Sequence, residues 1–530
     1  MASATATAGA VPVPRPAEEA IDKRKLIAFL GMVFGMFMAI LDIQIVSASL
    51  SEIQAGLGAS ADEIPWVQTA YLIAEVIMIP LSGFLSRVIS TRWMFAISAG
   101  GFTVMSFLCG TATSIDQMIV YRALQGFIGG GMIPTVFASA FTIFPRSKQP
   151  IVSPLIGLVA TLAPTIGPTV GGYLTQLLSW HWLFFINVGP GIVVTLMAVS
   201  MIDFDEPDLA LFDHFDWWGL ISMGTFLGSL EYVLEEGPTN DWFDDQAVLV
   251  MAIASAVGAV VFFWRAFTVK EPIVDLRAFK DRNFATGSLF SFVMGIGLYG
   301  LTYLFPVYLG RVRGYDSLMI GETMFVTGLC MFFTAPIAGN LMRILDPRVM
   351  LFAGFVGFGA GTWIMSGITH DWDFWEILVP QVLRGVSLMT CMVPITNIAL
   401  GTLPPQRIKN ASGLFNLTRN LGGAVGLAVI NTVLNHRDDL HLQRLRESVH
   451  WGSETALETL DNIRQGLSTF GASAEAMATS QMVGMLRREA LVMSFADVFL
   501  ILTMLFVSLG FGAFLVRRPQ MAGGGGGGGH

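Results

Sequence analysis

The sequence predicts an all-α polytopic membrane protein with fourteen membrane-spanning helices. Of the 530 residues, 53% are hydrophobic and only 13% are charged, and the mean hydropathy is +0.64. Soluble domains are typically about 25% charged, so this composition indicates a lipid environment. The apolar residues also form long continuous runs, not the alternating segments of about ten residues that build a membrane barrel.

Fourteen of these runs reach the roughly 20 residues that a helix needs to cross a hydrocarbon layer of about 30 Å. In chain order the expected spans are 26–50, 64–85, 93–113, 117–140, 151–178, 182–202, 217–236, 246–267, 284–309, 318–341, 349–369, 376–400, 411–434 and 493–515. Only residues 179–181 separate the fifth run from the sixth.

The distribution of Lys and Arg predicts the orientation of the chain. With a cytoplasmic N-terminus, the segments on the inside hold nineteen of the 30 basic residues, whereas the short outside loops hold only Arg311 and Arg313. The long segment 435–492 is left out of this comparison because long loops are translocated largely regardless of charge. Both termini are therefore expected in the cytoplasm.

The spans group as six, two and six, which predicts two matched halves related about the membrane normal. A short internal similarity supports this: Arg122-Ala-Leu-Gln-Gly126 and Arg384-Gly385 each lie in the fourth span of a half. The expected organisation is a disordered tail 1–25, an N-terminal half 26–202, two inserted helices with their linkers 203–283, a C-terminal half 284–515 that includes the long periplasmic loop 435–492, and a glycine-rich tail 516–530.

Composition and motifs exclude several classes of function. The three cysteines lie in separate apolar runs without metal-ligand spacing, and the histidines fall in or beside predicted loops, which disfavours a metal or haem enzyme in the membrane. The sequence contains no G-x-x-x-x-G-K-[ST] loop, so ATP is not expected to drive transport. We expect no enzymatic activity, no cofactor, no bound metal and no nucleic-acid partner.

Charged residues inside the spans are the first candidates for function. Asp42 lies in the first span and Arg122 in the fourth, and a rise of 1.5 Å per residue puts them within about 5 Å in depth. Glu75 lies near the middle of the second span. A carboxylate at the centre of a membrane helix costs about 2.5–3.5 kcal/mol, so it must be paired, hydrated or protonated. Asp42, Glu75 and Arg122 are therefore predicted to couple transport to protons, or else to form a structural pair.

The fifth span carries a second candidate, the run from Ala163 to Gly172. Its two prolines remove backbone donors and favour bending, and its glycines allow another helix to approach closely. A helix of this kind suits a gate. The predicted gating residues are Pro164, Gly167, Pro168, Gly171 and Gly172.

Other polar residues in the spans are candidates for substrate contact, namely Gln44, Gln125, Arg384, Asn416 and Arg419. The two arginines could bind an anionic substrate or only cap the helix bundle. Glu231, Glu322 and Asp497 lie near the outer ends of spans, where we expect them to be hydrated.

These motifs together resemble the major facilitator superfamily, in its fourteen-helix drug:proton antiporter branch of the EmrB/QacA type. Leu41-Asp42 with Ile45-Val46 resembles the first-helix motif of the branch, Arg122 to Gly126 its fourth-helix motif, and Gly167-Pro168 with Gly171-Gly172 its antiporter motif. The resemblance to the EmrB type is closer and covers almost the whole chain. It includes Trp182 to Val188, Pro272 to Leu276, Arg282 to Phe284, Leu403 to Pro405, Asn416 to Arg419 and the glycine tail Gly523 to His530.

The resemblance implies alternating access in the bacterial inner membrane, with export of hydrophobic toxic compounds in exchange for protons. It also implies a periplasmic adaptor protein of the EmrA type and, through the adaptor, an outer-membrane channel of the TolC type. An importer or uniporter of a specific metabolite on the same fold is the alternative function. The antiporter motif of the fifth span argues against it.

Two positions depart from the family pattern. Arg87 stands where the loop between the second and third spans usually has an Asp, so these residues do not support the usual ion-paired cytoplasmic latch. Gln44 stands where Thr is usual in the first-helix motif.

The segment 435–492 is much longer than the other connections. Two of its stretches, His441 to Glu447 and Thr455 to Ile463, have apolar residues at helical spacing. We expect amphipathic helices that lie over the periplasmic mouth, either as a passive lid or as a docking site for the adaptor.

Overall fold

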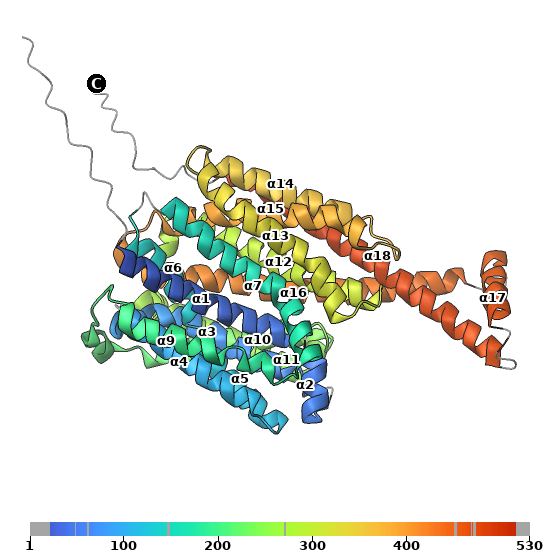
Figure 1. Ribbon diagram of the computed structural model, residues 1–530, viewed down its shortest axis with the longest axis horizontal. Helices are drawn as coiled ribbons and strands as arrows, with labels where there is room; N and C mark the ends of the chain where they lie inside the picture. The colour runs from blue at the N-terminus through green and yellow to red at the C-terminus, as the bar shows by residue number, and fades with distance from the viewer. Residues whose placement is uncertain are drawn as a thin grey trace, which may run out of the picture.

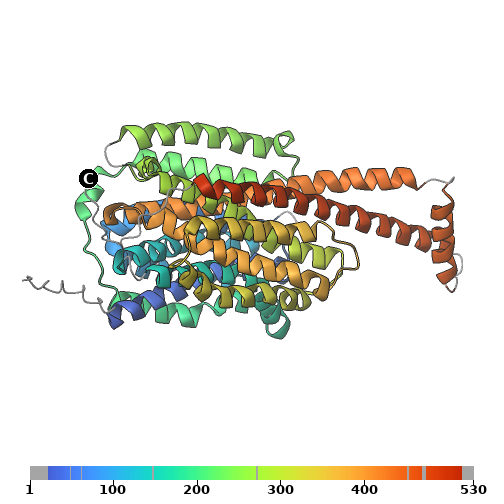
Figure 2. The ribbon, with the colours of Figure 1, turned by 90° about the horizontal axis from the view of Figure 1, so that it is seen from above.

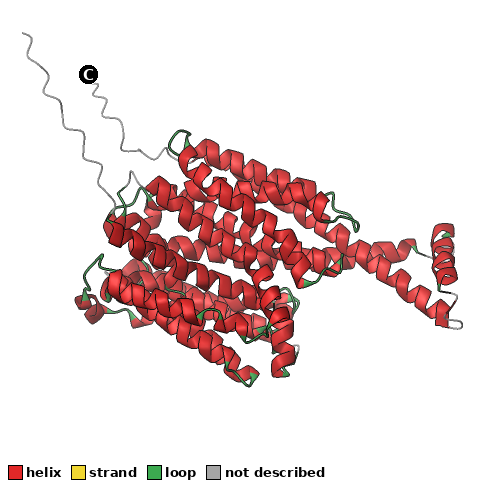
Figure 3. Ribbon diagram, viewed as in Figure 1, coloured by secondary structure: helices red, strands yellow, loops and turns green. Residues whose placement is uncertain are grey.

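The computed structural model describes residues 22–47, 49–60, 63–145, 149–269, 272–449, 453–467, 469 and 473–515, and this part of the chain is helical with connecting loops (Figure 3). The helices of the first part are α1 (Lys23–Ser47), α2 (Leu50–Leu57), α3 (Trp66–Val88), α4 (Ser90–Gly110), α5 (Ile115–Gly129), α6 (Met132–Ile143), α7 (Gln149–Leu177), α8 (Trp182–Phe185), α9 (Val188–Met201), η1 (Leu209–His214), α10 (Trp217–Glu236), η2 (Trp242–Asp244) and α11 (Gln246–Thr268). The second part has η3 (Leu276–Lys280), α12 (Arg282–Arg311), α13 (Ser317–Leu341), α14 (Pro347–Met365), α15 (Phe374–Leu400), α16 (Pro405–Ser448), α17 (Glu454–Gly466), α18 (Ala474–Gly512) and η5 (Ala513–Leu515).

Within the described ranges, thirteen helical segments are long and apolar enough to cross a membrane, which confirms the polytopic helical fold. Two expected spans consist of two consecutive helices each, α5 with α6 and α8 with α9. The break between α5 and α6 falls at Gly130 and Gly131, which are poor helix formers. The expected span 217–236 corresponds to α10, which has 20 residues but carries Glu231, Glu235 and Glu236 near its end. A fourteenth crossing by α10 stays a prediction, as does the cytoplasmic location of the termini.

The long helices run roughly side by side along the bundle, and the beginning of α1 and the end of α18 lie at the same end of it (Figures 1 and 2). Helices α1, α3 to α6, α8 and α9 pack mainly among themselves, as do α12, α14 to α16 and α18, whereas α7 and α13 pack most extensively against each other. Contacts of α7 with α13 and α15, and of α16 with α3 and α6, join the two groups. The predicted tails 1–21 and 516–530 lie outside the described residues.

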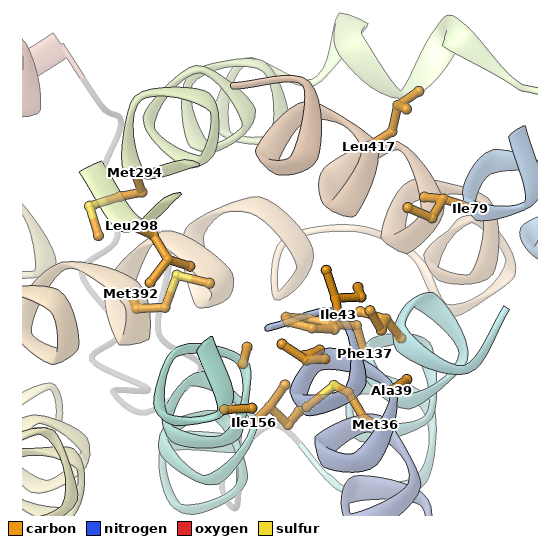
Figure 4. Close-up of a cluster of buried hydrophobic side chains, with 14 of the residues drawn as sticks. Met36, Ala39, Ile43, Ile79, Phe137, Ile156, Met294, Leu298, Met392 and Leu417 are labelled. Atoms are coloured by element: carbon orange, nitrogen blue, oxygen red, sulfur yellow. The ribbon is translucent and has the colours of Figure 1, made fainter. Parts of the chain in front are cut away.

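An apolar layer fills the seam between the two groups of helices (Figure 4). Its side chains are at most 9% exposed and come from both groups; those labelled in the figure are Met36, Ala39, Ile43, Ile79, Phe137, Ile156, Met294, Leu298, Met392 and Leu417. Because lipid tails are as apolar as these side chains, close van der Waals packing, and not transfer from water, is what this layer contributes to holding the halves together.

The described residues of the segment 435–492 do not lie over the end of the bundle, so that prediction was wrong. Instead α16 and α18 continue beyond the bundle, and α17 lies across their far ends (Figures 1 and 2). We call the described residues between 436 and 492 the stalk. Both predicted helices exist, within α16 and α17. The helical periodicity was interpreted correctly, but it cannot tell whether the apolar face covers the bundle or faces another helix of the stalk.

Candidate functional site

A buried ion pair joins the first and fourth spans. An Nη1–H of Arg122 on α5 donates to the Asp42 carboxylate on α1 at 2.6 Å, and both side chains are fully buried. The same guanidinium donates to Gln125 Oε1 at 2.8 Å and to the carbonyl oxygen of Val67 at 3.2 Å. It also lies 4.2 Å from the centre of the Tyr71 ring, a favourable cation–π contact. The predicted partners are therefore brought together, and Gln125 serves the pair by accepting from Arg122.

The second carboxylate oxygen of Asp42 is held by a residue that sequence reasoning missed. The amide of Asn187, at the beginning of α9, donates to Asp42 Oδ1 at 2.7 Å and to Ser106 Oγ at 3.1 Å. Ser106 in turn donates to the carbonyl oxygen of Phe184 at 2.9 Å. In the sequence, the signal for Asn187 was a single polar amide side chain within an apolar run. Charge-assisted bonds of this kind are roughly twice as strong as neutral ones, so Asp42 is fixed in place by two spans besides its own.

A cavity of about 420 Å³ lies between the halves, within the size range of small-molecule sites. It is lined from α1, α3, α7, α10, α12, α13 and α16. The polar lining side chains are Gln44, Ser47, Gln68, Glu75, Glu231, Glu235, Tyr299, Thr302, Tyr303, Asn420 and Asn431. Glu75 is 3% exposed and, among the described residues, has no hydrogen-bond or ion-pair partner.

One expectation, that Glu231 is hydrated, was wrong, and the five predicted substrate contacts stay a prediction. Glu231, expected to be hydrated at the end of its span, is only 6% exposed, because the side of α10 that carries it faces the cavity between the helices and not the outer surface. Glu322 is exposed, as expected. Of the five predicted substrate contacts, only Gln44 lines the cavity; Gln125, Arg384, Asn416 and Arg419 are buried in the helix packing beside it.

The glycines of the fifth span form a close crossing of α7 and α1. A Cβ on Gly167 would overlap the Cβ of Gln44, and one on Gly171 would lie 3.0 Å from the carbonyl oxygen of Ile45. Pro168 lines the cavity, whereas Pro164 and Gly172 are buried within the described part of the bundle. The predicted gating segment therefore connects the helix of Asp42 with the cavity, although nothing here tests a gating motion.

The second half contains buried arginines without acidic partners. Arg384 donates to Thr302 Oγ1 at 2.5 Å, and its Nε and Nη1 have no partner among the described residues. Arg419 donates to Asn416 Oδ1 at 2.8 Å and leaves its Nε and Nη1 equally unsatisfied in the described structure. Each lies near an aromatic ring, Arg384 at 5.5 Å from that of Phe305. Both arginines are therefore buried in the helix packing beside the cavity.

At the end of the bundle that carries the basic loops, an ion pair joins the second half to the segment that follows α9. Lys409 on α16 bonds to the carboxylate of Asp205 and donates to the carbonyl oxygen of Ser86 at 3.1 Å. Asp205 also accepts from the Thr91 backbone amide at 3.1 Å. Arg87 stands where the family usually has an Asp, but Asp205, in the segment after α9, provides an acid at this end of the bundle. Sequence spacing could not reveal this pairing because the two partners are far apart in the chain.

Two helical halves with a polar cavity between them define a membrane transporter. Residues 32–427 match the Major Facilitator Superfamily. The chain is 42% identical over 92% of its length to the colistin resistance protein EmrB of Acinetobacter baumannii, covering 94% of that protein. It is 30% identical to the fatty acid resistance protein FarB of Neisseria gonorrhoeae, over 83% of this chain and 87% of that one. It is 29% identical to the multidrug export protein EmrB of Escherichia coli K12, over 80% and 83%.

The chain therefore belongs to the major facilitator superfamily. Its spans and relatives make it a multi-pass transporter of the bacterial inner membrane that takes small molecules, not an enzyme. A similar fold is found in the human organic anion transporter MFSD10, with a TM-score of 0.57 at 11% identity, over 92% of this chain and 100% of that one.

Proposed function

We propose that the chain is a multidrug efflux transporter that exports hydrophobic toxic compounds across the inner membrane in exchange for protons. Its relatives carry names that refer to colistin resistance, fatty acid resistance and multidrug export. The observation that carries the proton part of the proposal is the fully buried Asp42–Arg122 pair beside a cavity between the halves. A titratable acid and a permanent cation, both shielded from water, form a pair whose charge balance changes when one proton binds.

The coupling step follows from this balance. When Asp42 takes up a proton it can no longer neutralise Arg122, so the guanidinium is left as an uncompensated charge in the membrane. The contacts of α1 with α5 and α7 must then rearrange, which links proton binding to the access state. Glu75 lines the cavity, has no partner in the described part of the chain and offers a second acid that can exchange a proton without breaking an ion pair.

The state of the bundle supports alternating access with the cytoplasmic side closed. Phe137, Ile156 and Met392 of the apolar layer, and the Lys409–Asp205 contact, belong to the parts of their helices that lie toward the end predicted to be cytoplasmic. The cavity residues Gln44 and Glu235 lie in the last turns of α1 and α10, toward the opposite end. We assign this arrangement to a state from which substrate leaves toward the periplasm, and the α1–α7 crossing at Gly167 to the gate.

Transport in proteoliposomes tests this proposal. With a pH gradient imposed across the vesicle membrane, a panel of hydrophobic substrates should move against the direction of proton flow, and the movement should reverse when the gradient is reversed. Movement in the same direction as protons would establish an importer instead. Substrate movement that does not depend on the pH gradient would establish a uniporter.

We further propose that the stalk docks a periplasmic adaptor of the EmrA type, which would connect the transporter to an outer-membrane channel of the TolC type. None of the 13 residues of α17 is buried, and isolated helices of this length are marginally stable in water. Leu457, Met477, Val483 and Met485 are 37–41% exposed on the stalk helices. An exposed apolar surface on a projecting element is typical of a protein contact.

Replacing residues 445–485 by a short Gly/Ser linker tests the docking. The base of the stalk stays intact in this variant, because His441 bonds to Asp497 at 2.8 Å below the deletion. We expect vesicle transport to persist while co-purification with the adaptor and whole-cell drug resistance are lost. A matched variant with Leu457→Ser and Met485→Ser keeps the length of the stalk and should weaken adaptor binding alone. Adaptor recovered at the wild-type yield with the shortened protein would show that the stalk is not the docking site.

A further inference from the structure

The inserted helix α10 forms one wall of the cavity. It lies on one flank of the bundle, with α11 outside it (Figure 2), and packs against α3 of the first half and α16 of the second. The ring centres of Trp66 on α3 and Tyr232 on α10 are 5.7 Å apart. Just beyond α10, Trp242 Nε1 donates to Thr432 Oγ1 on α16 at 3.0 Å. The insertion therefore bridges both halves and closes the seam beside the cavity.

The charge of this cavity is uniformly acidic. Glu231 and Glu235 on α10 line it together with Glu75 on α3, and no Lys, Arg or His is among its described lining residues. Glu75 is 3% and Glu231 is 6% exposed, and neither has a hydrogen-bond or ion-pair partner within the described ranges. Buried carboxyl groups are normally satisfied by protein partners, so two unpartnered ones at a cavity wall point to a ligand.

Arg419, a buried cation of the second half, does not pair with these carboxyl groups. Arg419 is on α16 but is absent from the described lining of the cavity; it donates to Asn416 and lies 5.3 Å from the Phe137 ring. The remaining cavity wall favours a large organic ion. Tyr299 and Tyr303 offer aromatic surface that can bind a cation, and apolar residues of α3, α10 and α12 complete the lining.

We propose that this cavity binds lipophilic cations, and that the inserted helix α10 selects them through Glu231 and Glu235. The proposal rests on the export function above and names its substrate class. In a low-dielectric site a monovalent cation is attracted by each carboxyl group that is ionised, whereas an anion of the same shape is repelled by it. On this account the insertion is part of the binding site and not only a peripheral addition to the two halves.

Equilibrium binding to the purified protein in detergent, without any proton gradient, tests the inference. Tetraphenylphosphonium and tetraphenylborate are the probes, because they share shape and hydrophobicity and differ in the sign of their charge. We expect the cation to bind at least about tenfold more tightly than the anion. Glu231→Gln and Glu235→Gln should each weaken cation binding by about tenfold. Glu236→Gln is the matched control, since Glu236 is the next residue on α10, does not line the cavity and bonds to Asn240.

The outcomes separate this inference from the export proposal. Equal binding of the two probes, or an unchanged affinity for the cation in both Glu231→Gln and Glu235→Gln, would overturn it. If Glu231→Gln fails to give folded protein by gel filtration, Glu235→Gln decides alone, because Glu235 is only partly buried. Charge-selective, α10-dependent binding in a protein that shows no proton-driven transport would leave this inference standing and remove the proposed coupling.

Discussion

Arg122 and Arg384 occupy matching places in the two halves but have different partners. Each is buried in the fourth span of its half and reaches the first span of that half. Arg122 meets the carboxylate of Asp42 at 2.6 Å, whereas Arg384 meets the hydroxyl of Thr302 at 2.5 Å and leaves two guanidinium nitrogens without partners in the described structure. The two halves therefore place an arginine at the same position but give it partners of different charge.

This difference assigns separate tasks to the halves. Among the described residues, only the first half has an acid opposite its arginine, so the balance of a buried pair can change there when a proton binds. The second half contributes cavity wall and, through Lys409, part of the closure at the basic end. We therefore expect substitutions at equivalent positions to have unequal effects.

The largest difference is expected in stability. Arg122→Met leaves the buried Asp42 carboxylate unpaired and should destabilise the protein by about 3–5 kcal/mol. Arg384→Met removes an unpaired buried cation and should leave stability unchanged or raise it. Thermal unfolding of both variants in detergent measures the contrast. Equal losses in the two variants would mean that Arg384 has a counter-charge equivalent to Asp42.

A smaller effect is expected at the gate of the first half. Gly167→Ala places a methyl group against Gln44, two residues from Asp42, and overpacking of this kind typically costs about 1–3 kcal/mol. The same change at Gly157 meets Met392 at 3.5 Å, an ordinary contact, and serves as the control. Cysteine accessibility from each side of the membrane should shift by tenfold or more for Gly167→Ala only. The same accessibility pattern in both variants would show that the crossing of α1 and α7 is not the gate.

The smallest effect is expected at the closure of the basic end. Lys409→Gln removes a partly buried ion pair worth about 1 kcal/mol or less, so that end should open up to about fivefold more often. A cysteine at buried, unpartnered Ser139 should then react faster with a maleimide added from the cytoplasm. Arg407→Gln, an exposed position on the same helix, should leave the rate unchanged. An effect of Lys409→Gln no larger than that of Arg407→Gln would show that the ion pair does not hold this end closed.

The sequence predicted the membrane-spanning helices well because each needs only local information, the length and hydropathy of a run. The Asp42–Arg122 pair was also accessible, since residue counting along two helices gives their depth. Depth does not reveal which way a side chain faces, which is why buried Glu231 was expected to be hydrated. Lys409 and Asp205 could not be paired from sequence, because their contact depends on how the two halves pack.

Proton-driven accumulation by Asp42→Asn and Arg384→Met in proteoliposomes tests the division of tasks most directly. One proton crossing 100 mV with a tenfold pH gradient can sustain a substrate gradient of a few hundredfold. Arg384→Met should reach the wild-type accumulation. Asp42→Asn should fall to about the equilibrium ratio of one, while it still exchanges labelled substrate across the membrane in the absence of a pH gradient. Wild-type accumulation by Asp42→Asn, or loss of accumulation in Arg384→Met alone, would contradict the assignment of coupling to the first half.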